Sequence, residues 1–202
     1  MRATAKTITR SLVALTVMMT MYASALAHVA EGGADGFLTG FNHPLSGWDH
    51  ILAMVAVGLW GAQLGPPAIW LLPITFPLMM AIGGFLGLIG VPLPGVEIGI
   101  ALSAVVLGVS IARQARPPLW MCMAIVAVFA LFHGHAHGTE LQPGADALAY
   151  SLGFVIATGL LHAVGITIGV LRRWKVGEWG VQGMGAGVSI AGLVLLMEAV
   201  NW

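Results

Sequence analysis

Six long apolar runs, separated by short breaks, occupy this sequence from about residue 44 to its end. Each is long enough to cross the hydrocarbon core of a bilayer as a helix, which takes about 20 apolar residues. Proline and glycine supply the breaks, and no polar segment is long enough for a second, soluble domain. The runs are roughly 44–63, 67–90, 95–112, 118–138, 146–171 and 179–201. The sequence therefore predicts an all-α fold, a polytopic membrane helix bundle with six transmembrane helices.

The composition agrees with this prediction. Only 8% of the 202 residues are charged and 58% are hydrophobic, whereas soluble domains carry about 25% charged residues. The single cysteine, Cys122, lies within an apolar run, so the sequence offers neither a disulfide pair nor a thiolate metal cluster. We expect membrane lipid around the chain and no nucleic-acid partner.

Residues 1–27 have the features of a cleavable signal peptide. Arg2, Lys6 and Arg10 form a basic region, an apolar stretch follows at 12–22, and Ala25-Leu26-Ala27 matches a small-x-small cleavage site. The alternative is an uncleaved anchor helix, although the apolar stretch is shorter than the roughly 20 residues of a span. Cleavage would leave residues 28–202 as the transmembrane domain. Its first residue, His28, is a candidate metal chelator through its amine and imidazole, or simply part of a polar tail.

The basic residues after the signal predict an orientation. Arg113 and Arg116 follow the third run, and Arg172, Arg173 and Lys175 follow the fifth. All five fall in loops that are cytoplasmic if the mature chain starts outside, as the positive-inside rule requires. We therefore expect a bacterial inner-membrane protein whose mature N-terminus is periplasmic.

Glycines spaced four residues apart predict close contacts between helices. Gly83 with Gly87, and Gly183 with Gly187, have the small-xxx-small spacing that brings two helix backbones together. The 28 glycines as a whole are typical of a tightly packed bundle.

Two polar motifs lie at the ends of the apolar runs. One is His43-Pro44-Leu45-Ser46-Gly47-Trp48-Asp49-His50, and the other is Phe132-His133-Gly134-His135-Ala136-His137-Gly138-Thr139-Glu140. Ionisable groups at membrane depth cost several kcal/mol unless they face a packed interior, water or a partner. In the six-span arrangement both motifs lie at the outer side, as does Glu97, which like His135 is a further candidate metal ligand. We expect the two motifs to meet in one site for a divalent metal ion.

Helical spacing sharpens this expectation. If the fourth run stays helical to its end, His133, His137 and Glu140 share one face and His135 points elsewhere. Asp49 and His50 can both reach into the bundle from the first run. His43 precedes a proline and is expected in the loop leading into that run, where a turn over 44–47 would bring it to His50.

The ligand types favour a borderline divalent cation. Imidazole with carboxylate and no thiolate suits nickel, zinc, cobalt and copper(II). The carboxylates are either ligands or outer partners that fix a histidine tautomer, and the sequence does not decide between these. His162, in the middle of the fifth run, is a candidate second station for the ion, although a lone transmembrane histidine is more often a hydrogen-bond partner between helices.

The two motifs resemble the signature motifs of the HupE/UreJ family of bacterial metal permeases. The resemblance extends to the signal sequence, the six runs and the Gly-Phe-Leu-Thr-Gly segment at 36–40. It implies a link to hydrogenase or urease maturation proteins, and nickel or cobalt as substrate. It also implies functional roles for His43, Asp49 and His50 in the first motif and for His133, His137 and Glu140 in the second.

Together these features predict a secondary permease, not an enzyme, that brings nickel, or next cobalt, from periplasm to cytoplasm. No Walker-type nucleotide loop is found, so a gradient or an external partner would supply the energy. One alternative is an intramembrane hydrolase, with zinc on His50, His133 and His137 and with Asp49 or Glu140 as general base. A metal sensor that binds without transport is the other.

Overall fold

The computed structural model describes residues 36–141 and 146–201, and all regular structure in these two ranges is helical. The predicted signal peptide, His28 and the break at 142–144 lie outside the described residues. An all-α fold is therefore confirmed for the described part of the chain.

Seven α-helices and one short 3-10 turn make up the two ranges. In chain order they are α2 (Gly36–Ser46), α3 (Trp48–Leu64), α4 (Ala68–Leu88), α5 (Val96–Ala112), α6 (Leu119–Glu140), α7 (Ala147–Val170), η1 (Leu171–Arg173) and α8 (Lys175–Val200). Helices α4 to α8 begin and end within four residues of the last five predicted runs.

Four of these helices have the length and hydropathy of membrane spans. They are α4, α6, α7 with its 3-10 extension, and α8. Helices α3 and α5 have 17 residues each, which corresponds to about 25 Å of helix. The count of six transmembrane helices stays a prediction.

The first predicted run is divided in two, and the expectation for His43 was wrong. Residues 44–46 belong to α2, which begins at Gly36, and the chain bends at Gly47 before α3. His43 therefore lies in a helix rather than in a loop, although Pro44 follows it. Pro44 lacks the backbone N–H that would bond the Gly40 carbonyl in the last turn of α2. The packing of α2 along α7 offsets this loss.

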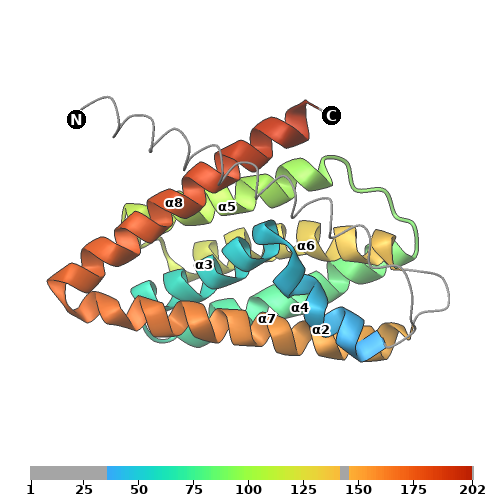
Figure 1. Cartoon of the computed structure of the whole chain (residues 1–202), viewed down its shortest axis with the longest axis horizontal. Helices are drawn as coiled ribbons and strands as arrows, with labels where there is room; N and C mark the ends of the chain where they lie inside the picture. The colour runs from blue at the N-terminus through green and yellow to red at the C-terminus, as the bar shows by residue number, and fades with distance from the viewer. Residues whose placement is uncertain (1–35, 142–145, 202) are drawn as a thin grey trace, which may run out of the picture.

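Helix α3 is the centre of the bundle. It contacts α2, α4, α5, α7 and α8, while α4 pairs with α6 and α5 pairs with α8 (Figure 1). Its side chains Met54, Val57 and Trp60 are fully buried. The turn between α7 and α8 and the connection between α4 and α5 lie at opposite ends of this bundle (Figure 1).

Glycines bring α4 and α6 into backbone contact. A Cβ added to Gly83 would overlap the Leu131 carbonyl oxygen, and one added to Gly87 would overlap that of His135. From the other side, Gly134 meets the Met80 carbonyl in the same way. The close approach predicted at Gly83 and Gly87 is therefore confirmed.

The second predicted glycine pair was wrong. Nothing lies within 4 Å of a Cβ built on Gly183 or Gly187. Instead, Gly185 and Gly192, on another face of α8, lie against α5, where a Cβ on Gly185 would stand 2.6 Å from the Ala112 nitrogen. Spacing alone does not tell which face of a helix meets its neighbour.

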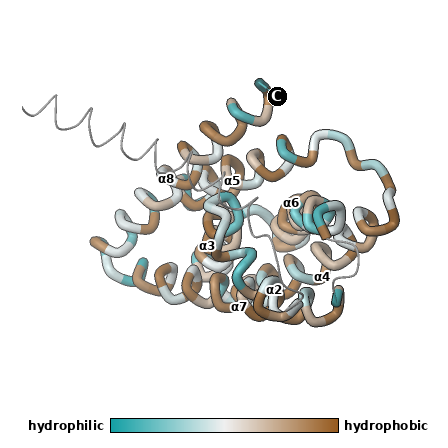
Figure 2. Tube along the Cα trace, turned by 45° about the vertical axis from the view of Figure 1, so that its right-hand side comes forward, coloured by the Kyte–Doolittle hydropathy of each residue, from teal (hydrophilic) through white to brown (hydrophobic). Residues whose placement is uncertain are grey.

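Large apolar side chains cover the outward faces of the bundle. On α4, Ile74, Leu78 and Phe85 are all more than half exposed, and apolar residues continue along α7 and α8 (Figure 2). An apolar surface of this extent is unusual on a soluble protein and matches contact with lipid.

Candidate metal site

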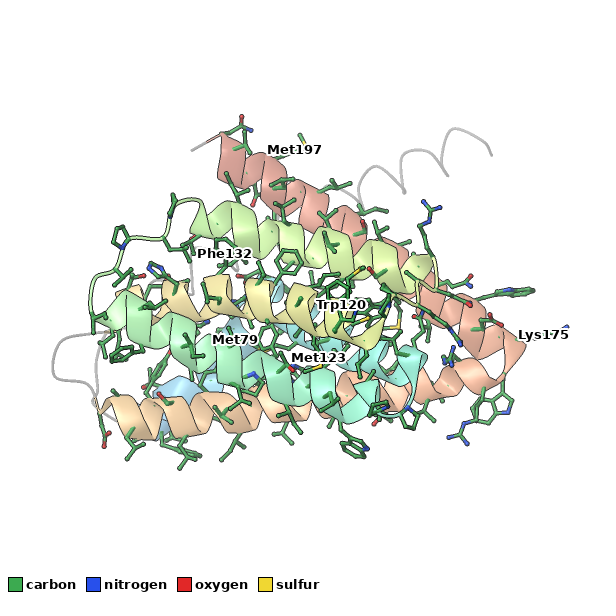
Figure 3. All side chains as sticks on the ribbon, turned by 180° about the vertical axis from the view of Figure 1, so that it is seen from behind. Met79, Trp120, Met123, Phe132, Lys175 and Met197 are labelled. Atoms are coloured by element: carbon green, nitrogen blue, oxygen red, sulfur yellow. The ribbon has the colours of Figure 1, made fainter. Side chains whose placement is uncertain are left out.

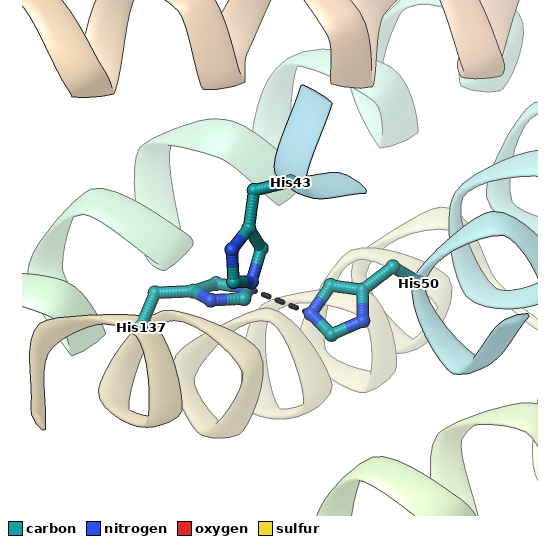
Figure 4. A group of neighbouring side chains, drawn as sticks. All are labelled: His43, His50 and His137. Carbon is teal, nitrogen blue, oxygen red and sulfur yellow. Dashed lines mark hydrogen bonds between the residues drawn. The ribbon is translucent and has the colours of Figure 1, made fainter. Parts of the chain in front are cut away.

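Three imidazoles from three helices meet at one end of the bundle. His43 comes from α2, His50 from α3 and His137 from α6, and each offers a ring nitrogen within 4.8 Å of the other two (Figure 4). We call these three residues the histidine cluster. His50 and His137 are buried, and their Nε2 atoms are 2.7 Å apart. One of these two nitrogens must carry the proton that they share.

A carboxylate stands behind each of the two buried rings. Asp49 Oδ1 lies 2.9 Å from His50 Nδ1, at ion-pair distance but without good hydrogen-bond geometry. Glu140 Oε2 lies 3.9 Å from His137 Nδ1. Both carboxylates thus approach the Nδ1 side and leave the Nε2 atoms facing each other. This is the place of outer partners that orient metal-binding histidines.

His133 adds a fourth imidazole beneath the histidine cluster. It is completely buried, and its Nδ1–H donates a 2.9 Å hydrogen bond to the Phe129 carbonyl. This bond fixes the tautomer, so Nε2 carries a lone pair, and Nε2 has no hydrogen-bond partner among the described residues. Its ring centroid is 5.6 Å from that of His50. His133 Nε2 can therefore serve as a further metal ligand next to the histidine cluster.

The helical form of α6 sets this arrangement. The helix continues through Glu140, so His133 and His137 lie one above the other on the same face. His135 faces another way, because its Nε2–H donates a 2.7 Å hydrogen bond to the carbonyl of Val91 in the α4–α5 connection. It holds this loop and is not part of the histidine cluster.

Two aromatic residues of α7 form a wall of the site that the sequence motifs do not include. The Phe154 ring centroid is 4.6 Å from that of His137 and 6.0 Å from that of His43. Tyr150, one turn earlier, is 6.0 Å from His43. Their spacing of four residues on an apolar helix is the only sequence signal for this role, and it is common in helix cores. The wall keeps water from one side of the imidazoles.

Of the other candidate residues, the structure brings neither His162 nor Glu97 into the histidine cluster. His162 is buried, and its ring centroid is 5.5 Å from that of Phe76, which in turn is 5.6 Å from that of His133. Glu97 is exposed in the first turn of α5. His28 lies outside the described residues.

Gly47 makes room for the Asp49–His50 pair. Its backbone is extended (φ −102°, ψ 126°), a conformation open to any residue. A Cβ there would stand 2.6 Å from Asp49 Oδ1 and 2.8 Å from His50 Nδ1.

We expect Gly47→Ala to lower nickel affinity about 10- to 100-fold, because the added Cβ displaces the Asp49–His50 pair. The unfolding temperature should not fall. Calorimetric titration would measure the affinity, and thermal unfolding in detergent would measure the stability. Gly159→Ala, in open space, is the control, and equal affinities in both variants would contradict this expectation.

The comparisons with known proteins identify the family of this chain. The family model described as HupE / UreJ protein matches residues 15–195, which include both histidine motifs. The chain belongs to the HupE/UreJ family. It is 44% identical over 183 residues to Protein HupE of Rhizobium leguminosarum bv. viciae, an alignment that covers 90% of this chain and 96% of that protein. No solved structure matches this HupE/UreJ chain.

Proposed function

We propose that this chain is a secondary permease that brings a divalent transition metal, nickel first and cobalt next, from periplasm to cytoplasm. The observation that carries the proposal is the histidine cluster, in which imidazoles from three helices converge at one end of an apolar bundle. Neutral imidazoles oriented by carboxylates suit nickel and cobalt. The relationship to a protein named HupE supports the same class of function.

The buried polar groups along α6 and α7 support a path inward from the cluster. His133 Nε2, His162 Nε2 and Thr158 Oγ1 are all buried without hydrogen-bond partners in the described ranges. The Phe76 ring contacts both imidazoles, with its centroid 5.6 Å from that of His133 and 5.5 Å from that of His162. An ion would therefore pass from the histidine cluster to His133 and then, once Phe76 moves, to His162.

Charge supports the proposed orientation in the inner membrane. Arg172, Arg173 and Lys175 gather at the turn between α7 and α8, and Lys175 and Met197 mark opposite ends of α8 (Figure 3). By the positive-inside rule, we expect the Lys175 end in the cytoplasm and the histidine cluster at the periplasmic side. A reporter domain fused after Lys175 should therefore be cytoplasmic, and periplasmic activity of that fusion would refute the orientation.

Metal uptake by liposomes that contain the purified protein tests the function. Nickel, cobalt, zinc and copper would each be added outside, and an enclosed fluorescent indicator would report their arrival. We expect nickel to enter fastest, with cobalt next, and protein-free liposomes to show no comparable rate. Stoichiometric binding of nickel without uptake would contradict the permease and favour a sensor.

A further inference from the structure

A second group of polar side chains lies at the opposite end of α3 from the histidine cluster. Gln63 is in the last turn of α3, Gln114 follows α5, and Glu178 is in the first turn of α8. These three residues, which we call the inner polar cluster, line one pocket together with Arg172, Val181 and Gln182. They lie near the turn between α7 and α8, at the left of Figure 1.

Gln63 is the most unusual member of the inner polar cluster. Its side chain is 1% exposed, and neither its amide oxygen nor its amide nitrogen has a hydrogen-bond partner within the described ranges. Buried amides in folded proteins are nearly always hydrogen-bonded, so an orphaned one needs an explanation. Its amide oxygen is therefore available as a ligand for an ion that enters the pocket.

Gln114 holds an unfavourable backbone conformation while its side chain contacts Glu178. Its φ of 52° lies in the left-handed region, where glycine is usual after a helix. Backbone hydrogen bonds fix this turn, from Gln114 N to Ile111 O at 3.1 Å and from Ala115 N to Ser110 O at 2.8 Å. The side-chain Nε2–H of Gln114 donates to Glu178 Oε1. The backbone conformation of Gln114 thus places its side-chain amide against the Glu178 carboxylate.

The inner polar cluster is closed in this structure. The space between its side chains does not admit a water molecule. Glu178 is only half-buried, and it accepts its hydrogen bond from a neutral amide. Arg172 also lines the pocket, but the salt bridges among the described residues include none between Arg172 and Glu178. The carboxylate charge is therefore available to a cation once Gln114 moves away.

We propose that Gln63, Gln114 and Glu178 form the site from which the permease releases its cation into the cytoplasm, closed by the Gln114–Glu178 hydrogen bond. The inference rests on the proposed transport function. An arriving ion takes the Glu178 carboxylate and the Gln63 amide oxygen as ligands and displaces Gln114. Oxygen ligands hold nickel more weakly than imidazoles do, so the ion moves from a tight site to a loose one and leaves.

Nickel uptake by the Glu178→Gln variant tests this release site. The substitution keeps the shape of the side chain and removes its charge. We expect the initial rate of Ni²⁺ uptake into liposomes to fall at least about 10-fold. Ni²⁺ affinity at the histidine cluster should stay within about two-fold, because the two sites are far apart. Glu198→Gln, at the other end of α8 and exposed, should transport like the wild type. Wild-type uptake by Glu178→Gln would overturn the proposal.

A second variant tests the release site in case Glu178→Gln does not fold. A second measurement, of binding alone, distinguishes failure of the release site from failure of the proposed permease function. Gln63→Leu removes the orphaned amide without reducing apolar packing, so it should fold and still transport at least about 10-fold more slowly. Independently of transport, Mn²⁺ binding followed by electron paramagnetic resonance in the His50→Ala/His137→Ala double variant should show one weak site that Glu178→Gln removes. A protein that binds but does not transport would refute the permease, while a Mn²⁺ signal unaffected by Glu178→Gln would refute the release site.

Discussion

Nickel binding should fall at least about 100-fold when His137 is replaced by alanine, and His50→Ala should have the same effect. Outer partners of metal-binding histidines already contribute 10- to 100-fold, so the loss of a ligand costs at least as much. His137 contacts every other member of the histidine cluster and its Nε2 lies 2.7 Å from that of His50. Removal of either ring takes away one of the two Nε2 atoms that face each other. Uptake into liposomes should therefore be lost together with nickel binding.

The matched control for this prediction is His135→Gln. His135 belongs to the same motif and helix, but its ring donates to the Val91 carbonyl and lies outside the histidine cluster. Glutamine preserves a donor for this bond, so the loop should stay in place. Calorimetric titration with Ni²⁺ would compare the variants with the wild type. Nickel binding lost in His135→Gln but retained in His137→Ala would show that the ion binds elsewhere.

The second large effect is expected for Gly134→Leu, and it concerns folding. A side chain at this position would overlap the Met80 carbonyl oxygen at the α4–α6 contact. The obstruction is backbone rather than a movable side chain, so the two helices must separate. Overpacking typically costs about 1–3 kcal/mol, and a rigid backbone obstruction puts this variant at the upper end of that range. We expect little folded protein in detergent, measured as the monodisperse fraction in size-exclusion chromatography and as the thermal unfolding temperature.

Gly183→Leu is the control for the packing prediction. Gly183 is also a helical glycine among apolar residues, but it faces outward, and a Cβ at this position would meet nothing within 4 Å. The variant should express and unfold like the wild type. Equal yields of the two leucine variants would mean that α4 and α6 do not pack through Gly134.

The helices were largely predictable from the sequence, because apolar runs of membrane length leave few alternatives to a helix. The five runs after residue 66 correspond to α4 through α8. The first run was harder, since Pro44 normally discourages a helix at His43. Packing of α2 against α7 outweighs that preference, and contacts between distant segments are not visible in local sequence.

The meeting of the two motifs was predictable from the sequence, whereas the metal-binding roles of their residues stay predictions. The two motifs bring His50 and His137 into contact, as the spacing on α6 suggested. Asp49 and Glu140 approach the Nδ1 side of the two rings because of their rotamers. These rotamers depend on tertiary packing and cannot be predicted from the local sequence. Gln63 gave no signal either, because a single glutamine near a helix end is ordinary until its burial is known.

In the permease proposed above, the short central helix α3 sets the distance between the outer and the inner binding residues. His50 and Gln63 stand near its two ends, at residues 3 and 16 of the helix, and a helix rises about 1.5 Å per residue. The two residues are therefore separated by about 20 Å along the axis, compared with roughly 30 Å for a hydrocarbon core. In the proposed permease, an ion that moves between these two residues would cross a shorter low-dielectric layer than the full hydrocarbon core, and a shorter layer lowers the electrostatic barrier to a divalent ion.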